Sequence, residues 1–148
     1  MFTAPNFIDP TTATRWHFVL ANADFMLNDE NSEHLPEVLR ERRRFFRESK
    51  AAVNFFVVPN PAWLPALPEV AKRVRTPAVA IVSPDASWIA YVKLRMDRVL
   101  KGELEGSLAE VTASTGPVPP FAKPAAWTAP YNKYSAGWWS MFTPGGDA

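Results

Sequence analysis

Apolar residues in the first hundred positions follow two patterns, short continuous runs and longer stretches with helical spacing. The runs at 16–21, 52–58 and 78–83 are rich in β-branched and aromatic residues and predict buried strands. The stretches at 35–49, 62–75 and 86–101 place apolar residues on one helical face and predict helices, with a further single turn at 25–27. Strands that are apolar throughout favour a sheet covered on its faces. We therefore expect a small α/β domain with a three- to four-stranded sheet covered by helices.

Residues at the helix ends support this interpretation. Asp85 precedes the stretch at 86–101 and is a suitable N-cap, and Gly102 is the expected stop signal. Pro36 suits the first turn of the helix at 35–49, where its missing N–H costs nothing. Pro65 and Pro68 interrupt the start of the stretch at 62–75, which makes that helix the least regular.

The chain divides into three parts by composition. Residues 1–15 are expected to form an extended arm, and residues 16–106 the α/β core domain. Residues 107–148 are rich in Pro and large rings, which is unlike a flexible linker. We expect this tail to lie extended, docked on the core or on a partner. Its rings are Phe121, Trp127, Tyr131, Tyr134, Trp138, Trp139 and Phe142.

Charge and cysteine content exclude several classes of function. The 16 basic and 15 acidic residues nearly cancel, whereas a general nucleic-acid binder usually has a strong basic excess. The absence of Cys rules out disulfides and thiolate metal ligands. No apolar run approaches the roughly 20 residues that span a bilayer, and the first residues do not resemble a secretory signal. Any membrane contact is expected to be indirect.

Known catalytic and ligand-binding motifs are missing from the sequence. His17 and His34 have no second ligand at a metal-binding spacing, and the glycines match no phosphate-binding loop. Ser83 and Asp85 follow a strand, and we interpret them as a turn and helix cap rather than a catalytic pair. We therefore expect no metal, no cofactor and no enzymatic activity of the chain's own.

Two Arg-containing regions are candidates for interaction. The stretch RERRRFFRESK at 40–50 has two interpretations. It is either a solvated helix face with Glu–Arg pairs or a surface that binds RNA or anionic lipid. Within it, Arg42 lies on the apolar stripe, where it covers the core edge or faces a partner. Arg95 lies at the edge of the stripe of the helix at 86–101, and Tyr91 and Leu94 lie off that stripe. This resembles the composition of an interface hot spot, although ordinary surface scatter explains it equally well.

Four blocks in order resemble a known family: WHFVLANADFML at 16–27, VLRERRRFF at 38–46, PAVAIVS at 77–83 and WIAYVKLRMDRVLKGELEG at 88–106. Together they resemble the low-chlorophyll-accumulation A family, and the tail at 121–142 resembles its plant and green-algal members. The resemblance implies a non-catalytic accessory or assembly factor in chlorophyll biosynthesis. It would bind the di-iron catalytic subunit of the magnesium-protoporphyrin IX monomethyl ester oxidative cyclase, with contacts to other enzymes of that synthesis. It also implies the chloroplast stroma, peripheral to thylakoid or envelope through the partner.

The resemblance implies partner contacts at Ala21, at Asn54 with Phe55, and at Arg95. Asn54 departs from the family, which usually has an acidic residue there, so a charge-assisted contact would become a weaker neutral one. The residue pattern adds Arg42 and Leu94 to this set. Two alternatives stay open: a tetrapyrrole-binding carrier or chaperone using the aromatic tail, and an RNA-binding module on the Arg-rich helix.

Overall fold

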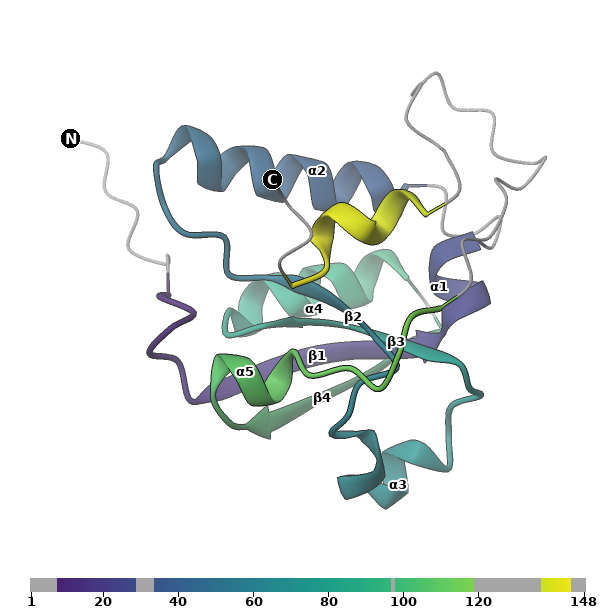
Figure 1. Cartoon of the computed structure of the whole chain (residues 1–148). Helices are drawn as coiled ribbons and strands as arrows, with labels where there is room; N and C mark the ends of the chain where they lie inside the picture. The colour runs from purple at the N-terminus through teal and green to yellow at the C-terminus, as the bar shows by residue number, and fades with distance from the viewer. Residues whose placement is uncertain (1–7, 29–33, 97, 119–136, 145–148) are drawn as a thin grey trace.

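A four-stranded antiparallel sheet forms the centre of the computed structural model, which describes residues 8–28, 34–96, 98–118 and 137–144. The strands are β1 (Arg15–Asn22), β2 (Phe56–Pro59), β3 (Ala78–Ser83) and β4 (Leu100–Glu105), in the order β2-β3-β1-β4 (Figure 1). Strand β1 pairs with β3 on one side and with β4 on the other, with Phe18 opposite Val82 and Gly102. The predicted small α/β domain is confirmed.

Helices cover both faces of this sheet, as the continuously apolar strands predict. One face carries α1 (Ala23–Asn28), α2 (Leu35–Glu48), α4 (Ala86–Arg95) and the short helix η3 (Trp138–Phe142). The other carries only short helices, η2 (Leu64–Ala66), α3 (Pro68–Ala71) and α5 (Leu108–Val111). Figure 1 shows α2 and η3 on the opposite side of the sheet from α3.

The face under α2 and α4 is built on an aromatic cluster. Phe55 lies at its centre, with ring centroids 5.0 Å from Trp88, 5.9 Å from Phe142 and 6.4 Å from Phe46. Val19 and Ile81 supply the sheet side of this core. Burial of large rings is the strongest apolar contribution a core of this size has available.

The opposite face is closed by close contacts between strands. Phe18 of β1 lies across Gly102 of β4, where a Cβ atom would come within 2.6 Å of the tip of the ring. The same ring packs against Trp63, with centroids 4.8 Å apart. Gly102 is therefore required by packing inside a strand, and the prediction that it stops a helix is wrong.

The predicted helix at 86–101 is too long. Helix α4 ends at Arg95, and residues 100–105 form strand β4, in which inward and outward residues alternate. Pairing with β1 gives that segment backbone hydrogen bonds along one edge and buries one side of it, which outweighs its helical spacing.

Two further elements are shorter than predicted. The strand expected at 52–58 begins only at Phe56, which pairs with Val82 of β3. Pro84 follows β3 and has no backbone N–H, so it cannot donate the next hydrogen bond between the two strands. The helix expected at 62–75 is reduced to η2 and α3, and Pro68 stands at the first position of α3. The arm predicted at 1–15 is one residue too long, since β1 begins at Arg15.

The described part of the tail packs against the core. Trp138, Trp139 and Phe142 are buried, and the indole N–H of Trp138 donates to the carbonyl of Leu27 at 3.1 Å. The remaining rings of the tail, Phe121, Trp127, Tyr131 and Tyr134, lie outside the described residues. Within the described residues, no helix is both long and apolar enough to cross a bilayer.

Candidate functional site

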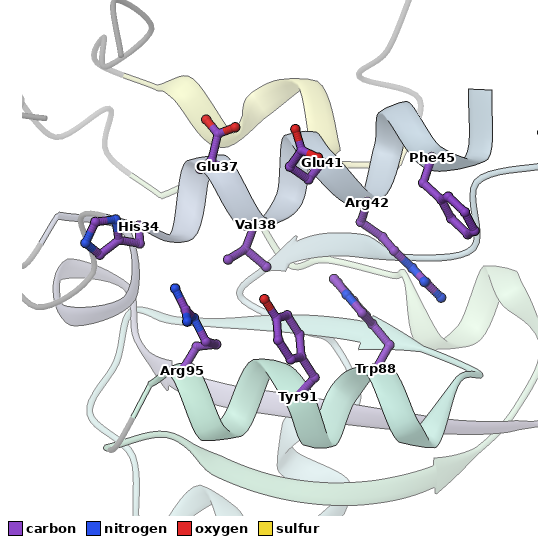
Figure 2. A pocket seen from close by; sticks show the side chains of 9 residues that line it. All are labelled: His34, Glu37, Val38, Glu41, Arg42, Phe45, Trp88, Tyr91 and Arg95. Carbon is purple, nitrogen blue, oxygen red and sulfur yellow. The ribbon is translucent and has the colours of Figure 1, made fainter. Parts of the chain in front are cut away.

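A groove runs between α2 and α4 on the aromatic face of the sheet. Its volume is about 450 Å³, and Figure 2 shows the side chains of both helices around it. A smaller hollow of about 260 Å³ shares several of its residues and reaches Leu94 and Met96. The larger groove is lined by His34, Glu37, Val38, Glu41, Arg42, Phe45, Trp88, Tyr91 and Arg95.

An ion pair connects the two helices beneath this groove. Arg42 Nη2 lies 2.8 Å from Asp85 Oδ2, and both side chains are largely buried. Asp85 Oδ1 also accepts the backbone N–H of Trp88 at 3.0 Å, which caps α4 as predicted. Asp85 thus binds α2 and the first turn of α4 at the same time.

Aromatic rings surround the same guanidinium. Its carbon lies 4.8 Å from the ring centroid of Phe46 and 5.3 Å from that of Trp88, within the range of cation–π contact. Burial lowers the pKa of Arg42, and the neighbouring Asp85 carboxylate opposes that shift. Arg42 therefore connects the two helices through its ion pair and its ring contacts. Of the two expectations for Arg42, the structure shows that it covers the core edge, and its contact with a partner stays a prediction.

The rim formed by the groove and the adjoining smaller hollow exposes apolar side chains. Leu94 is 81% exposed, Tyr91 47% and Phe45 41%. The prediction that Leu94 and Tyr91 lie off the buried stripe of α4 is confirmed, and Phe45 of α2 is exposed as well. Such a cluster on a helix pair is unlike scattered single residues and marks a surface suited to contact.

Unpaired charges flank these apolar groups. Arg95 is exposed, and among the described residues neither it nor Glu37 forms an ion pair. In Figure 2 the Arg95 side chain extends from α4 toward α2, near Val38. Its guanidinium is thus available to a carboxylate or carbonyl from outside, as a planar fork of donors.

The other predicted contact residues lie in the interior. Ala21 and Phe55 are 4% and 1% exposed, and Asn54 is fully buried. The Asn54 side-chain amide donates to the carbonyl of Ile8 at 3.0 Å, which holds the N-terminal segment on the core. These side chains are packed inside the folded chain, and the partner contact that the resemblance implies for them stays a prediction. Phe55 acts on the groove from beneath, through Trp88.

The structure also shows where the residues considered for catalysis or metal binding lie. Ser83 Oγ accepts the backbone N–H of Asp85 at 3.1 Å, which confirms the turn and cap. His34 lines the groove, while His17 lies in β1 opposite Ser83. Among the described residues, no group of three or more His, Cys, Asp or Glu side chains gathers at one place.

The two alternative surfaces are partly occupied within the chain. In the Arg-rich helix, Arg44 pairs with Glu41 and Glu48, at 3.5 and 3.2 Å. In the aromatic tail, Trp138, Trp139 and Phe142 cover the chain's own core. Sequence reasoning missed His34, Glu37, Val38 and Glu41 as groove residues, because no local pattern says that α2 faces α4.

Known proteins are similar to this chain mainly over the core domain. The family model of the Ycf54 protein matches residues 14–106. "Protein YCF54, chloroplastic" from Arabidopsis thaliana is 46% identical over 133 residues, covering 89% of this chain and 62% of that protein. This chain thus spans less than two thirds of the Arabidopsis protein. The "Ycf54-like protein" of Synechocystis sp. is 41% identical over 92 residues, covering 61% of this chain and 67% of that protein.

Solved structures of similar proteins have the same fold. The Ycf54 protein from Synechocystis sp. superposes with a TM-score of 0.62 at 35% identity, covering 70% of this chain and 98% of that one. The Ycf54 protein from Thermosynechococcus elongatus gives 0.60 at 34% identity, covering 70% and 97%.

Proposed function

The chain belongs to the Ycf54 family, and from that premise we propose that it is a non-catalytic accessory factor of the magnesium-protoporphyrin IX monomethyl ester oxidative cyclase. Its role is to bind and support the di-iron catalytic subunit in chlorophyll biosynthesis. The resemblance of the sequence blocks to the cyclase accessory family supports this assignment. The relative named chloroplastic in Arabidopsis supports the chloroplast as its location.

The observation that carries the proposal is the open groove between α2 and α4. It combines exposed apolar groups with an unpaired Arg95, the pattern of anchors that dominate protein interfaces. A hollow between two helices accepts a third helix, which is a common mode of recognition. We assign the occupant as an amphipathic helix of the catalytic subunit, with its apolar side on Leu94 and Tyr91.

Charge gives this helix its orientation. A carboxylate on the incoming helix would meet Arg95, and a basic residue would meet Glu37, which lines the same groove. Both groups are unpaired among the described residues, so binding adds ion pairs without breaking any in the chain. The contacts lie at a rim, where opposite charges mainly raise the association rate and select the partner.

Binding of the purified catalytic subunit to the full chain tests the proposal. The variants Arg95→Ala and Leu94→Ala are compared with wild type by calorimetry or pull-down. Truncating an apolar anchor costs about 2 kcal/mol or more, so we expect roughly a thirtyfold loss of affinity for Leu94→Ala. Arg95→Ala removes a charge at the rim and should mainly slow association. Arg15→Ala is the matched control, because Arg15 is an exposed arginine paired with Glu103 at 3.1 Å, in β1.

Turnover provides an independent readout. The chain alone should form no product from the magnesium porphyrin ester, while its addition should raise the yield or activity of the catalytic subunit. Equal recovery of wild type and both groove variants would remove the groove from the proposal. Failure of the wild type to bind the catalytic subunit at all would refute the function itself.

A further inference from the structure

A second hollow, which shares no residue with the α2–α4 groove, lies at the end of β1. Its volume is about 380 Å³, within the range of ligand sites. Leu20, Val74 and Leu100 contribute apolar surface to it. The surrounding charges come from three arginines, Arg73, Arg75 and Arg98, and from one carboxylate, Asp24.

Among the described residues the three arginines lack acidic partners, as Arg95 does. Other arginines form ion pairs, for instance Arg42 with Asp85 and Arg15 with Glu103. In the part of the chain that the structure describes, no ion pair involves Arg73, Arg75 or Arg98, and all three are exposed. Like charges gathered around one hollow repel each other unless an anion from outside lies between them.

The loop that carries two of these arginines is fixed to the sheet. The Asn22 side-chain amide donates to the carbonyl of Arg75 at 3.1 Å and to that of Pro77 at 3.3 Å. The backbone N–H of Arg73 donates to the carbonyl of Val70 at 3.0 Å. Because the backbone beneath the arginines is held, less conformational entropy is lost when their side chains bind an anion.

The character of the anion follows from the rest of the lining. Asp24 also lines the hollow, so its lining is not the purely cationic one that suits the dense double charge of a phosphate group or a lipid headgroup. Carboxylates fit better, because each matches the planar fork of one guanidinium. The apolar wall formed by Leu20, Val74 and Leu100 calls for an apolar side chain between them.

We propose that this hollow binds an acidic peptide segment of a protein partner, in which an apolar side chain lies between two carboxylates. The site, named here the β1-end pocket, is defined by Leu20, Arg73, Val74, Arg75, Arg98 and Leu100. It is separate from the proposed function, so the groove and the pocket succeed or fail independently.

Amide chemical shifts of the full chain, labelled with ¹⁵N, test this assignment even for weak binding. The probe is a capped peptide with the core Asp-Leu-Asp, titrated to millimolar concentration. We expect saturable shifts at the amides of Ala21, Asn22 and Val74, which line or adjoin the pocket. A matched peptide with the core Asn-Leu-Asn should give little shift, and one with the core Asp-Ser-Asp should bind more weakly.

Variants identify the residues responsible. Arg98→Gln and Arg75→Gln should each weaken the Asp-Leu-Asp peptide by up to about fivefold, the usual size for an exposed pair. Arg15→Gln, at the far end of β1, should leave the affinity unchanged. The proposal is overturned if no saturable shift occurs, if the amide peptide binds equally well, or if the Arg15 variant loses as much affinity. Tighter binding of pyrophosphate or of phosphatidylglycerol vesicles at the same amides would also overturn it, in favour of a phosphate site.

Discussion

The two faces of the sheet are covered in different ways. On one face, α2 and α4 meet over an aromatic cluster but leave a groove between them, with Leu94 81% exposed at its rim. On the other face, the short helices η2, α3 and α5 lie over close strand-to-strand contacts such as Phe18 on Gly102. The difference separates two tasks, since one face both stabilises the fold and presents a groove across it, while the centre of the other face only stabilises it.

The arrangement also shows how a small chain keeps an exposed apolar surface without losing stability. The rim residues of the groove lie on helices whose inner side chains are buried in the core. Ile89 and Val92 are examples from α4. Exposed Leu94 and Tyr91 therefore add little to folding, and their apolar surface is available to a partner. Substitutions on each face can test this difference, beginning with the centre of the aromatic cluster.

Phe55→Ala should have the largest effect on stability. The ring is 1% exposed and contacts three other rings, so its removal leaves a cavity in the core under the groove. We expect a loss of about 3–5 kcal/mol in the free energy of unfolding, measured by urea denaturation. Tyr91→Ala, from the exposed rim, is the control and should change it by less than about 0.5 kcal/mol. Equal effects would mean that Phe55 is not part of the core.

Asp85→Ala comes next, because it removes the helix cap and leaves the Arg42 guanidinium without its carboxylate. We expect a loss of about 2–3 kcal/mol, of which roughly 1 kcal/mol belongs to the cap. Asp85→Asn retains a cap and should lose less. In an Arg42→Met background the cost of Asp85→Ala should fall to the cap alone. Thermal or urea unfolding of the four variants checks this, and additive losses would contradict the coupling between the two residues.

Gly102→Ala tests the closed face. The added Cβ would meet the tip of the Phe18 ring, which is buried and held by Trp63. The ring cannot move aside freely, so we expect a loss of about 1–3 kcal/mol from overpacking. Phe18→Leu shortens the opposing side chain, and in that background the same change should cost less. If Gly102→Ala is neutral in both backgrounds, the contact does not limit the choice of residue at this position.

Parts of the fold follow from sequence pattern alone, because their signals are local. Strand β3 was predicted with its observed bounds, since a run of apolar β-branched residues is bounded by Pro77 and Pro84. The start of α4 was also correct, because Asp85 is a cap whose effect reaches only three residues. Both elements are specified by neighbours in the chain.

The errors occur where two periodicities compete. Met96, Val99 and Leu100 continue the helical spacing of α4, yet Leu100 and Leu104 also alternate with charged residues as in a strand. Only pairing with β1, which is distant in sequence, decides in favour of β4. The candidate site shows the same limit. Leu94 and Arg95 were identified from the helical wheel, but the groove requires knowing that α2 lies against α4.

Leu94→Ala should have the smallest effect on stability and thereby gives the sharpest test of the two-task arrangement. Leu94 is 81% exposed, so its truncation should change the free energy of unfolding by less than about 0.5 kcal/mol. Ile89→Ala, a change of similar size on the inner side of the same helix, should cost about 2–5 kcal/mol. Urea denaturation of both variants is paired with their affinity for the catalytic subunit. A Leu94 variant that unfolds like wild type but no longer binds separates the surface from the core, whereas one that is destabilised as much as the Ile89 variant would show that this rim belongs to the core.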